Sequence, residues 1–201
     1  MKDFAEKTFE NETIIIQSDI CIFLGPKSKF INCEITNKNS ARGLSLLNSE
    51  FIGGSFNTKK QLTSFQEDSC LYDGVKFSGK YVGCEFGGRP DMMMDFKNFG
   101  LVKNCDFSQA NMHYCRLFNA EIETITFTKW PVVTVLHPKQ DFDAMTVSDK
   151  AEILKLLPYT IEDEFEFTTA MMFNAEKLAK DIGLDIEDIK TKIQLFPRVY
   201  F

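Results

Sequence analysis

Large apolar residues recur at every fifth position between Cys105 and Phe127. The residue two positions before each of them is small or apolar, and the residue between the two is polar. This spacing matches neither the 3.6-residue period of a helix nor the two-residue period of a long strand. It fits a chain that forms a short strand, turns a corner and repeats, with alternate side chains inward and the middle one outward. The large positions are Phe107, Met112, Leu117, Ile122 and Phe127.

A longer period of 20 to 21 residues runs through the first two thirds of the chain. Three columns of large residues follow it: Phe9, Phe30, Phe51, Tyr72 and Met93; Ile14, Ile35, Phe56 and Phe77; and Phe65, Phe86 and Phe107. A fourth column holds residue types that tolerate tight corners, namely Asn32, Gly53 and Gly74. Repeats of this length predict a solenoid, in which stacked coils share one continuous core.

The most regular stretch also resembles a known family. The triads Ala110-Asn111-Met112, Cys115-Arg116-Leu117 and Ala120-Glu121-Ile122 are similar to the motif of pentapeptide-repeat proteins. That resemblance implies a right-handed, four-sided β-helix with about twenty residues per coil. The motif is strict over residues 105–127, and between residues 9 and 104 each coil is one residue longer.

The predicted fold is mostly β, with a small helical region at the C-terminal end. We expect an N-terminal cap over residues 1–12, a parallel β-helix of about five to six coils over residues 13–136, and helices within residues 137–201. A last strand is predicted at Val132–Leu136 and a linker over residues 137–140. Three helices are predicted. The first begins at Ser148 or Asp149 and stops at Pro158. The second runs from Thr168 to Ile182 with Gly183 as its C-cap, and the third runs from Asp185 to Gln194.

The net charge of −6 is unevenly spread along the chain. Residues 1–137 hold 16 acidic and 15 basic residues, whereas residues 138–201 hold 13 acidic and 8 basic residues. No basic patch is apparent in the sequence, so we expect no nucleic-acid binding. No apolar run approaches the ~18–20 residues needed to span a bilayer. The first residues lack the apolar segment of a secretory signal, so the expected location is cytoplasmic.

The cysteines and histidines offer little chemistry. Cys33, Cys84, Cys105 and Cys115 occupy inward positions, so we expect reduced, buried thiols, with Cys84 and Cys105 on adjacent coils. His113 is expected to be outward and solvated. The spacing of these residues provides no recognisable metal-ligand set, phosphate-binding loop or catalytic group. We therefore expect no cofactor and no metal, and a non-enzymatic role.

Two groups of residues are candidates for contacts with a partner. The acidic residues are expected to form a solvated face or, alternatively, a surface for a basic partner, with two of them stacked outward as a short acidic ladder. The apolar C-terminal end is expected either to dock on the rest of the chain or to form a homodimer contact. The acidic candidates are Glu162, Asp163, Glu164 and Glu166, with Glu85 and Asp106 as the ladder. The C-terminal candidates are Leu195, Phe196, Val199, Tyr200 and Phe201.

Three function classes remain open at this point. The first is a protein-binding solenoid, such as a toxin-neutralising (immunity) protein or effector that docks on a toxin or host protein. The second, implied by the family resemblance, is a DNA mimic that acts on a type II topoisomerase, which would need a more negative rod than residues 1–137 provide. The third is an enzyme with its site in the helical region. The composition favours the first class.

Overall fold

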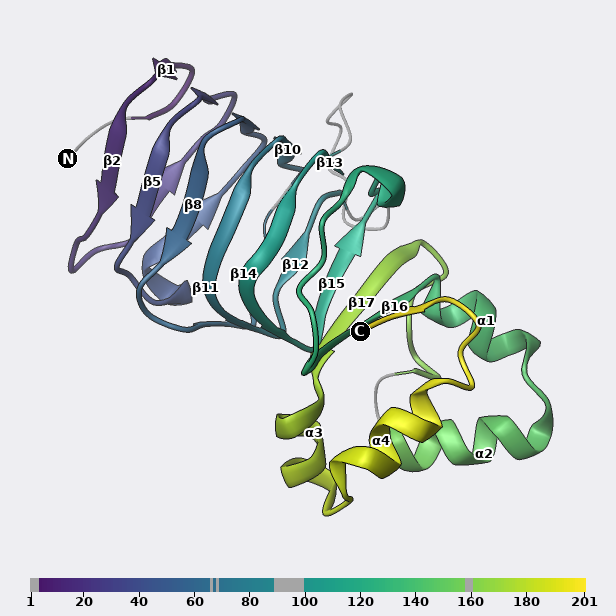
Figure 1. Ribbon diagram of the computed structural model, residues 1–201. Helices are drawn as coiled ribbons and strands as arrows, with labels where there is room; N and C mark the ends of the chain where they lie inside the picture. The colour runs from purple at the N-terminus through teal and green to yellow at the C-terminus, as the bar shows by residue number, and fades with distance from the viewer. Residues whose placement is uncertain (1–3, 66, 68, 89–99, 158–160) are drawn as a thin grey trace.

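Parallel strands fill the N-terminal two thirds of the molecule, and the helices gather at one end, as the computed structural model in Figure 1 shows. The structure describes residues 4–65, 67, 69–88, 100–157 and 161–201. Within these residues the protein is mostly β, with parallel sheets and four α-helices. None of the helices in these ranges is long and apolar enough to cross a bilayer.

Two parallel sheets are built from strands that return to the same position once per repeat. Thr8 pairs with Lys29 and Lys29 pairs with Glu50, so these repeats take 21 residues each. The first sheet has the order β1 (Thr8–Glu10), β4 (Lys29–Ile31), β7 (Glu50–Ile52), β10 (Leu71–Asp73) and β13 (Leu101–Lys103). The second has the order β14 (Asp106–His113), β11 (Lys76–Val82), β8 (Ser55–Thr58), β5 (Glu34–Asn37) and β2 (Thr13–Ile16), with β9 (Leu62–Thr63) also paired to β11. A smaller sheet joins β3 (Ile22–Leu24) to β6 (Leu44–Leu46).

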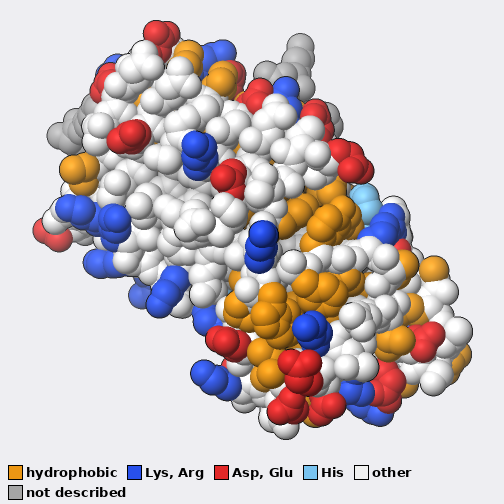
Figure 2. All heavy atoms as spheres, viewed as in Figure 1, with side chains coloured by type: hydrophobic (Ala, Val, Ile, Leu, Met, Phe, Trp, Pro, Cys, Tyr) orange, Lys and Arg blue, Asp and Glu red, His pale blue; other side chains and the backbone are white. Residues whose placement is uncertain are grey.

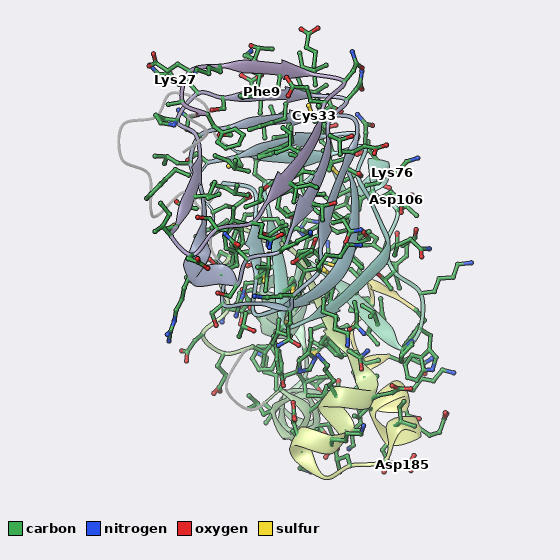
Figure 3. The ribbon with its side chains drawn as sticks, turned by 90° about the vertical axis from the view of Figure 1, so that its left-hand side faces the viewer. Phe9, Lys27, Cys33, Lys76, Asp106 and Asp185 are labelled. Carbon is green, nitrogen blue, oxygen red and sulfur yellow. The ribbon has the colours of Figure 1, made fainter. Side chains whose placement is uncertain are left out.

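Two of the predicted columns are confirmed as ladders of paired residues. In the first, the rings of Phe9, Phe30, Phe51 and Tyr72 follow one another with centroids 5.3, 4.9 and 5.1 Å apart and planes within 16° of parallel. In the second, the partners in neighbouring strands are Ile14, Ile35, Phe56 and Phe77. All of these side chains are buried, so the two ladders form the core between the sheets. Figure 3 shows Phe9 and Cys33 inside the ring of strands and Lys76 and Asp106 outside it.

The third predicted column is wrong at Phe107. Its ring stacks on Phe77, with centroids 4.6 Å apart and planes 4° from parallel, and Phe86 pairs instead with Leu117. The cause is one longer repeat, since Lys76 pairs with Asp106, 30 residues later. Met93 lies outside the described residues, and Val102 is the partner of Tyr72 in its place. The same shift puts Cys84 beside Cys115 rather than Cys105, because Glu85 and Phe86 pair with Arg116 and Leu117.

The predicted corner column is also confirmed. Asn32, Gly53 and Gly74 have φ values of 51°, 63° and 73°, in the left-handed region that asparagine and glycine adopt most easily. The backbone N–H of each donates to a carbonyl of the next repeat: Asn32 to Ile52, Gly53 to Asp73 and Gly74 to Lys103. The chain therefore turns at the same point in every one of these repeats.

Two glycines of the longer repeat, Gly88 and Gly100, approach each other closely. A Cβ atom placed on Gly88 would lie 2.8 Å from the nitrogen of Gly100, and one on Gly100 would lie 2.7 Å from the nitrogen of Gly88. Both distances are too short for a side chain, so glycine at both positions permits this backbone approach.

Three strands stand at the free N-terminal end of the sheets. These are β1, β2 and β3, and β1 falls inside the segment 1–12 that was predicted as a cap. The ring of Phe4 covers the first aromatic ladder, 5.3 Å from Phe9 and 6.0 Å from Phe30. Some of the expected capping is therefore provided by this side chain, which is buried.

The opposite end of the stack continues into a mixed sheet, in which β12 and β15 are parallel and the other neighbours are antiparallel. Its order is β12 (Glu85–Phe86), β15 (Cys115–Phe118), β17 (Thr168–Asn174), β16 (Val132–Leu136) and β18 (Val199–Tyr200). The strand predicted at Val132–Leu136 is confirmed, but the helix predicted from Thr168 begins only at Ala175. The two faces of β17 explain the error: Ala170 and Met172 pack on the parallel-sheet core, and Met171 and Phe173 pack on the helical core. A strand buried on both faces loses its alternating pattern.

Four helices pack around the second core. They are α1 (Pro138–Ala144), α2 (Val147–Leu156), α3 (Ala175–Ile182) and α4 (Ile186–Ile193). The linker predicted at residues 137–140 is wrong, because α1 begins at Pro138. Gly183 ends α3 with φ 70°, as predicted, and α4 lies within the predicted range 185–194, with Asp185 as its N-cap. The N-cap of α2 is Thr146, which accepts from the Asp149 N–H, and Pro158 lies outside the described residues.

Candidate interaction surfaces

The predicted acidic surface at residues 162–166 is only partly a surface. Glu162, Asp163 and Glu166 are exposed, but the Glu164 side chain is fully buried. Both Glu164 carboxylate oxygens accept from Arg116 Nε at 2.9 Å, and Oε1 also accepts from the Thr168 hydroxyl at 2.7 Å. Glu164, predicted as part of an acidic surface for a partner, is instead buried, and its bond to Arg116 joins the helical part to the parallel strands.

The predicted acidic ladder is not present. Glu85 is 6% exposed, and its carboxylate lies 4.0 Å from Nη1 of Arg116, its neighbour in β15. Asp106 lies in another sheet, beside Lys76. The longer repeat separates the two acids, so the ladder prediction is wrong and Glu85 is not accessible to a partner. Glu34, Ser55 and Lys76 lie in line across the second sheet.

The C-terminal end is docked against the rest of the chain. Phe196 is 2% exposed in the helical core, and Val199 pairs with Val135 of β16. Tyr200 and Phe201 are partly exposed, with their rings 5.7 Å from Phe127 and 6.0 Å from Trp130. Docking therefore accounts for most of the apolar character of this segment, while Leu195, Tyr200 and Phe201 remain 37%, 48% and 37% exposed.

His113 is buried at the junction of the two parts, so the prediction of a solvated histidine is wrong. Its Nδ1 accepts from the Asn174 N–H at 3.2 Å, and its Nε2 lies 3.4 Å from Asp181. Burial lowers the pKa of His113, while Asp181 opposes that shift and Lys177 adds to it. The neutral imidazole is the form that accepts the Asn174 hydrogen bond.

This arrangement predicts a loss of stability in mild acid. The folded-state pKa of His113 is lower than its ordinary value of 6.5, so the unfolded chain binds the proton more readily. The contribution of neutral His113 to the free energy of unfolding is fully present above pH 6.5 and is lost as the pH falls toward the folded-state pKa. We expect urea unfolding measured from pH 8 to pH 5 to show this fall, and His113→Gln to flatten it. His137, whose pKa is also lowered by burial, remains in that variant. Equal pH slopes for the variant and the wild type would contradict the assignment.

Metal-binding and thiol chemistry show no candidate site in the described ranges. No group of three or more His, Cys, Asp or Glu side chains there is arranged to hold a metal ion. All six cysteines are free, and only Cys21 is partly exposed. Burial is the main cause that raises the pKa of Cys105 to about 11, so this thiol is a poor nucleophile at neutral pH.

A surface that the sequence reasoning missed is a group of lysines at one corner of the stack, at the carboxyl ends of β2, β5, β8 and β11. Lys38 and Lys59 hold equivalent positions in successive repeats, because their N–H groups donate to Ile16 and Asn37. Lys80 lies opposite the Lys59–Gln61 turn, since Ser78 pairs with Asn57 and Tyr81 with Leu62. Figure 2 shows basic side chains along this lower-left edge. We call Lys38, Lys59, Lys60 and Lys80 the lysine corner.

An open hollow of about 510 Å³ lies at the lysine corner. It is lined by Gln17, Ser18, Asp19, Lys38, Asn39, Lys59 and Lys60. Lys59 and Lys60 are exposed and Lys38 is half-buried. Three large apolar residues of the first repeat are also exposed nearby in the chain: Ile15 at 60%, Ile20 at 58% and Phe23 at 59%.

The lysine corner had a signal in the sequence. Lys38, Lys59 and Lys80 are separated by 21 residues, the period of the aromatic columns. Net charge over residues 1–137 averages these lysines with acids on other walls, so it hid the local excess. Comparison with protein-family models, with curated proteins and with solved structures found no match for this chain.

Proposed function

We propose that this chain is a non-enzymatic protein-binding scaffold, such as a toxin-neutralising (immunity) protein or effector. In this proposal the parallel strands form a right-handed β-helix of the pentapeptide-repeat type, and an outer wall of it docks on a partner protein. The observation that carries the proposal is the register of the second sheet, which holds outward side chains in fixed rows across five strands.

A fixed wall suits recognition by docking. Each wall strand turns one set of side chains into the aromatic ladders and the other set toward solvent, as in the exposed–buried–exposed–buried pattern of β2. The ladders lock the inward set, so a partner meets a surface that loses little conformational entropy on binding. Outward positions on this wall are free to vary without disturbing the core, which suits adaptation to a particular partner.

The DNA-mimicking alternative gains no support from the charge on this wall. A DNA mimic needs a dense negative surface along the rod, and the lysine corner places positive charge there. We therefore retain the protein-binding function as the conclusion.

Capture with matched variants tests this function. The wall variant replaces Thr36 and Asn57, neighbours in β5 and β8, with glutamate. The control variant places two glutamates at exposed positions on the helical part, Thr191 and Gln194. Each tagged protein is incubated with bacterial lysate, captured proteins are identified by mass spectrometry, and the best candidate is then purified and its affinity measured directly.

We expect wild type and control to bind the purified partner equally and the wall variant to bind at least about tenfold more weakly, because two longer, charged side chains disrupt a packed interface. A toxic partner should also lose its toxicity when the wild-type chain is co-expressed. The proposal fails if no partner is enriched, or if the wall variant retains full affinity. Circular dichroism of all three proteins confirms that the substitutions leave the fold intact.

A further inference from the structure

We propose that the lysine corner and the exposed apolar residues beside it bind an acidic, amphipathic segment of the partner protein. This inference rests on the protein-binding function proposed above and names the chemistry of the segment that is recognised. Three features support it: the positive charge of the lysines, the rigidity of the backbone at the corner, and the exposed apolar residues of the first repeat.

Among the described residues, the lysines of this corner have no acidic partner, whereas at two other places on the stack a lysine pairs with an acid of a neighbouring repeat. Lys29 lies 2.9 Å from Glu50 and Lys103 lies 3.4 Å from Asp73, each an ion pair across adjacent strands. Within the described part of the chain, none of the four corner lysines is in an ion pair. Like charges on adjacent strands destabilise a sheet. An anionic partner would relieve that repulsion and gain from several ammonium groups at once.

The backbone behind the lysines is held by buried polar side chains. Asn39 accepts from the Ser18 N–H at 3.1 Å and donates to the Gly43 carbonyl at 2.8 Å. Asn37 donates to the Asn39 carbonyl at 3.0 Å, and the Thr58 hydroxyl donates to the Lys60 carbonyl at 2.6 Å. Asn37, Asn39 and Thr58 are at most 5% exposed. The turns that carry the lysines are thus fixed before any ligand arrives, which reduces the entropy lost on binding.

The exposed apolar residues beside the lysine corner favour a protein segment over other anionic ligands. Ile15 and Ile20 stand on either side of the Gln17–Asp19 segment that lines the hollow, and both are more than half exposed. A peptide with carboxylates and apolar side chains would use both features, as central apolar anchors with a charged rim do in protein interfaces. Nucleic acid is disfavoured, because the residues that line the hollow include Asp19 and no aromatic ring on which a base could stack.

Fluorescence anisotropy with a labelled peptide of Glu-Glu-Leu repeats tests the inference. We expect binding that weakens with salt, since exposed charges are screened. Lys59→Gln combined with Lys80→Gln should weaken binding by about tenfold. Lys129→Gln combined with Lys180→Gln removes the same charge from exposed positions away from the corner and should leave affinity unchanged. Ile15→Ser combined with Ile20→Ser should also weaken binding.

Three comparison probes make the result specific. Peptides of Gln-Gln-Leu and Glu-Glu-Ser repeats should both bind more weakly, the first for lack of charge and the second for lack of apolar anchors. A single-stranded oligothymidine of matched length should bind more weakly than the Glu-Glu-Leu peptide. The inference is overturned if the peptide does not bind, if both lysine variants lose affinity equally, or if the oligonucleotide binds more tightly. If the partner found by capture binds the Lys59/Lys80 variant fully, this inference falls while the protein-binding function stands.

Discussion

Replacing Arg116 with Met is expected to lower the free energy of unfolding by about 3–5 kcal/mol, because it leaves the Glu164 carboxylate buried without its counter-charge. Glu164 has a fully buried side chain, and Arg116 Nε donates to both of its oxygens at 2.9 Å. The pair joins β15 of the parallel part to the segment just before β17. The loss should therefore appear first as loosening of the helical part.

Urea unfolding and limited proteolysis measure this effect. Glu162→Gln is the matched control, because it removes a nearby carboxylate that is exposed, and we expect it to change stability by less than about 0.5 kcal/mol. Replacing both partners, Arg116→Met with Glu164→Met, should recover part of the loss, since no unpaired charge remains. If Arg116→Met is as mild as Glu162→Gln, the pair does not hold the two parts together.

Phe107→Ala is expected to cost about 3–5 kcal/mol, the range for a large aromatic side chain removed from a packed core. Phe107 is fully buried, stacked 4.6 Å from Phe77 and edge-on to Phe86 at 5.8 Å. Neighbours in a stack of strands cannot collapse easily into the cavity, because hydrogen bonds to both adjacent repeats fix their positions.

Phe23→Ala provides the control for this prediction. Phe23 is 59% exposed, so its loss should change stability by no more than about 0.5 kcal/mol. Thermal unfolding followed by circular dichroism compares the two variants with the wild type. Comparable melting temperatures for Phe107→Ala and Phe23→Ala would refute the aromatic ladder as the main source of stability.

The sequence predicted the columns well where each repeat has 21 residues, and poorly after the longer repeat. Phe107 stands 21 residues after Phe86, so it appears to continue that column. In the structure Asp106 pairs with Lys76, and this hydrogen-bond register places Phe107 on Phe77. Spacing alone cannot reveal an inserted segment when the residue at the expected position also has the expected chemistry.

The C-terminal part shows the opposite failure, a segment whose local pattern favours the wrong element. Ala170, Met171 and Met172 have no clear alternation, and Ala175 and Leu178 continue the apolar run at helical spacing. Because β17 is buried on both faces, neither periodicity identifies it as a strand. Its antiparallel pairing with β15 and β16 comes from tertiary contacts that local patterns do not encode.

The candidate surface could be predicted only in part for a related reason. Charge runs in the sequence pointed to residues 162–166, yet Glu164 is buried because Arg116, 48 residues earlier, lies beside it. The lysine corner was missed because its members are close in space and far apart in sequence. In a repeat protein, charges sort into surfaces by their phase within the repeat, so residues of equal phase must be compared before a patch is excluded.

Because Gly88 and Gly100 approach each other closely, the alignment of the neighbouring strands does not depend on the number of residues between the two glycines. Tyr72 and Val102 pair correctly although the repeat between them is 30 residues long. Deletions or insertions between the two glycines should leave both neighbouring repeats in register. The alignment of the ladders on either side therefore depends on this contact between two glycine backbones.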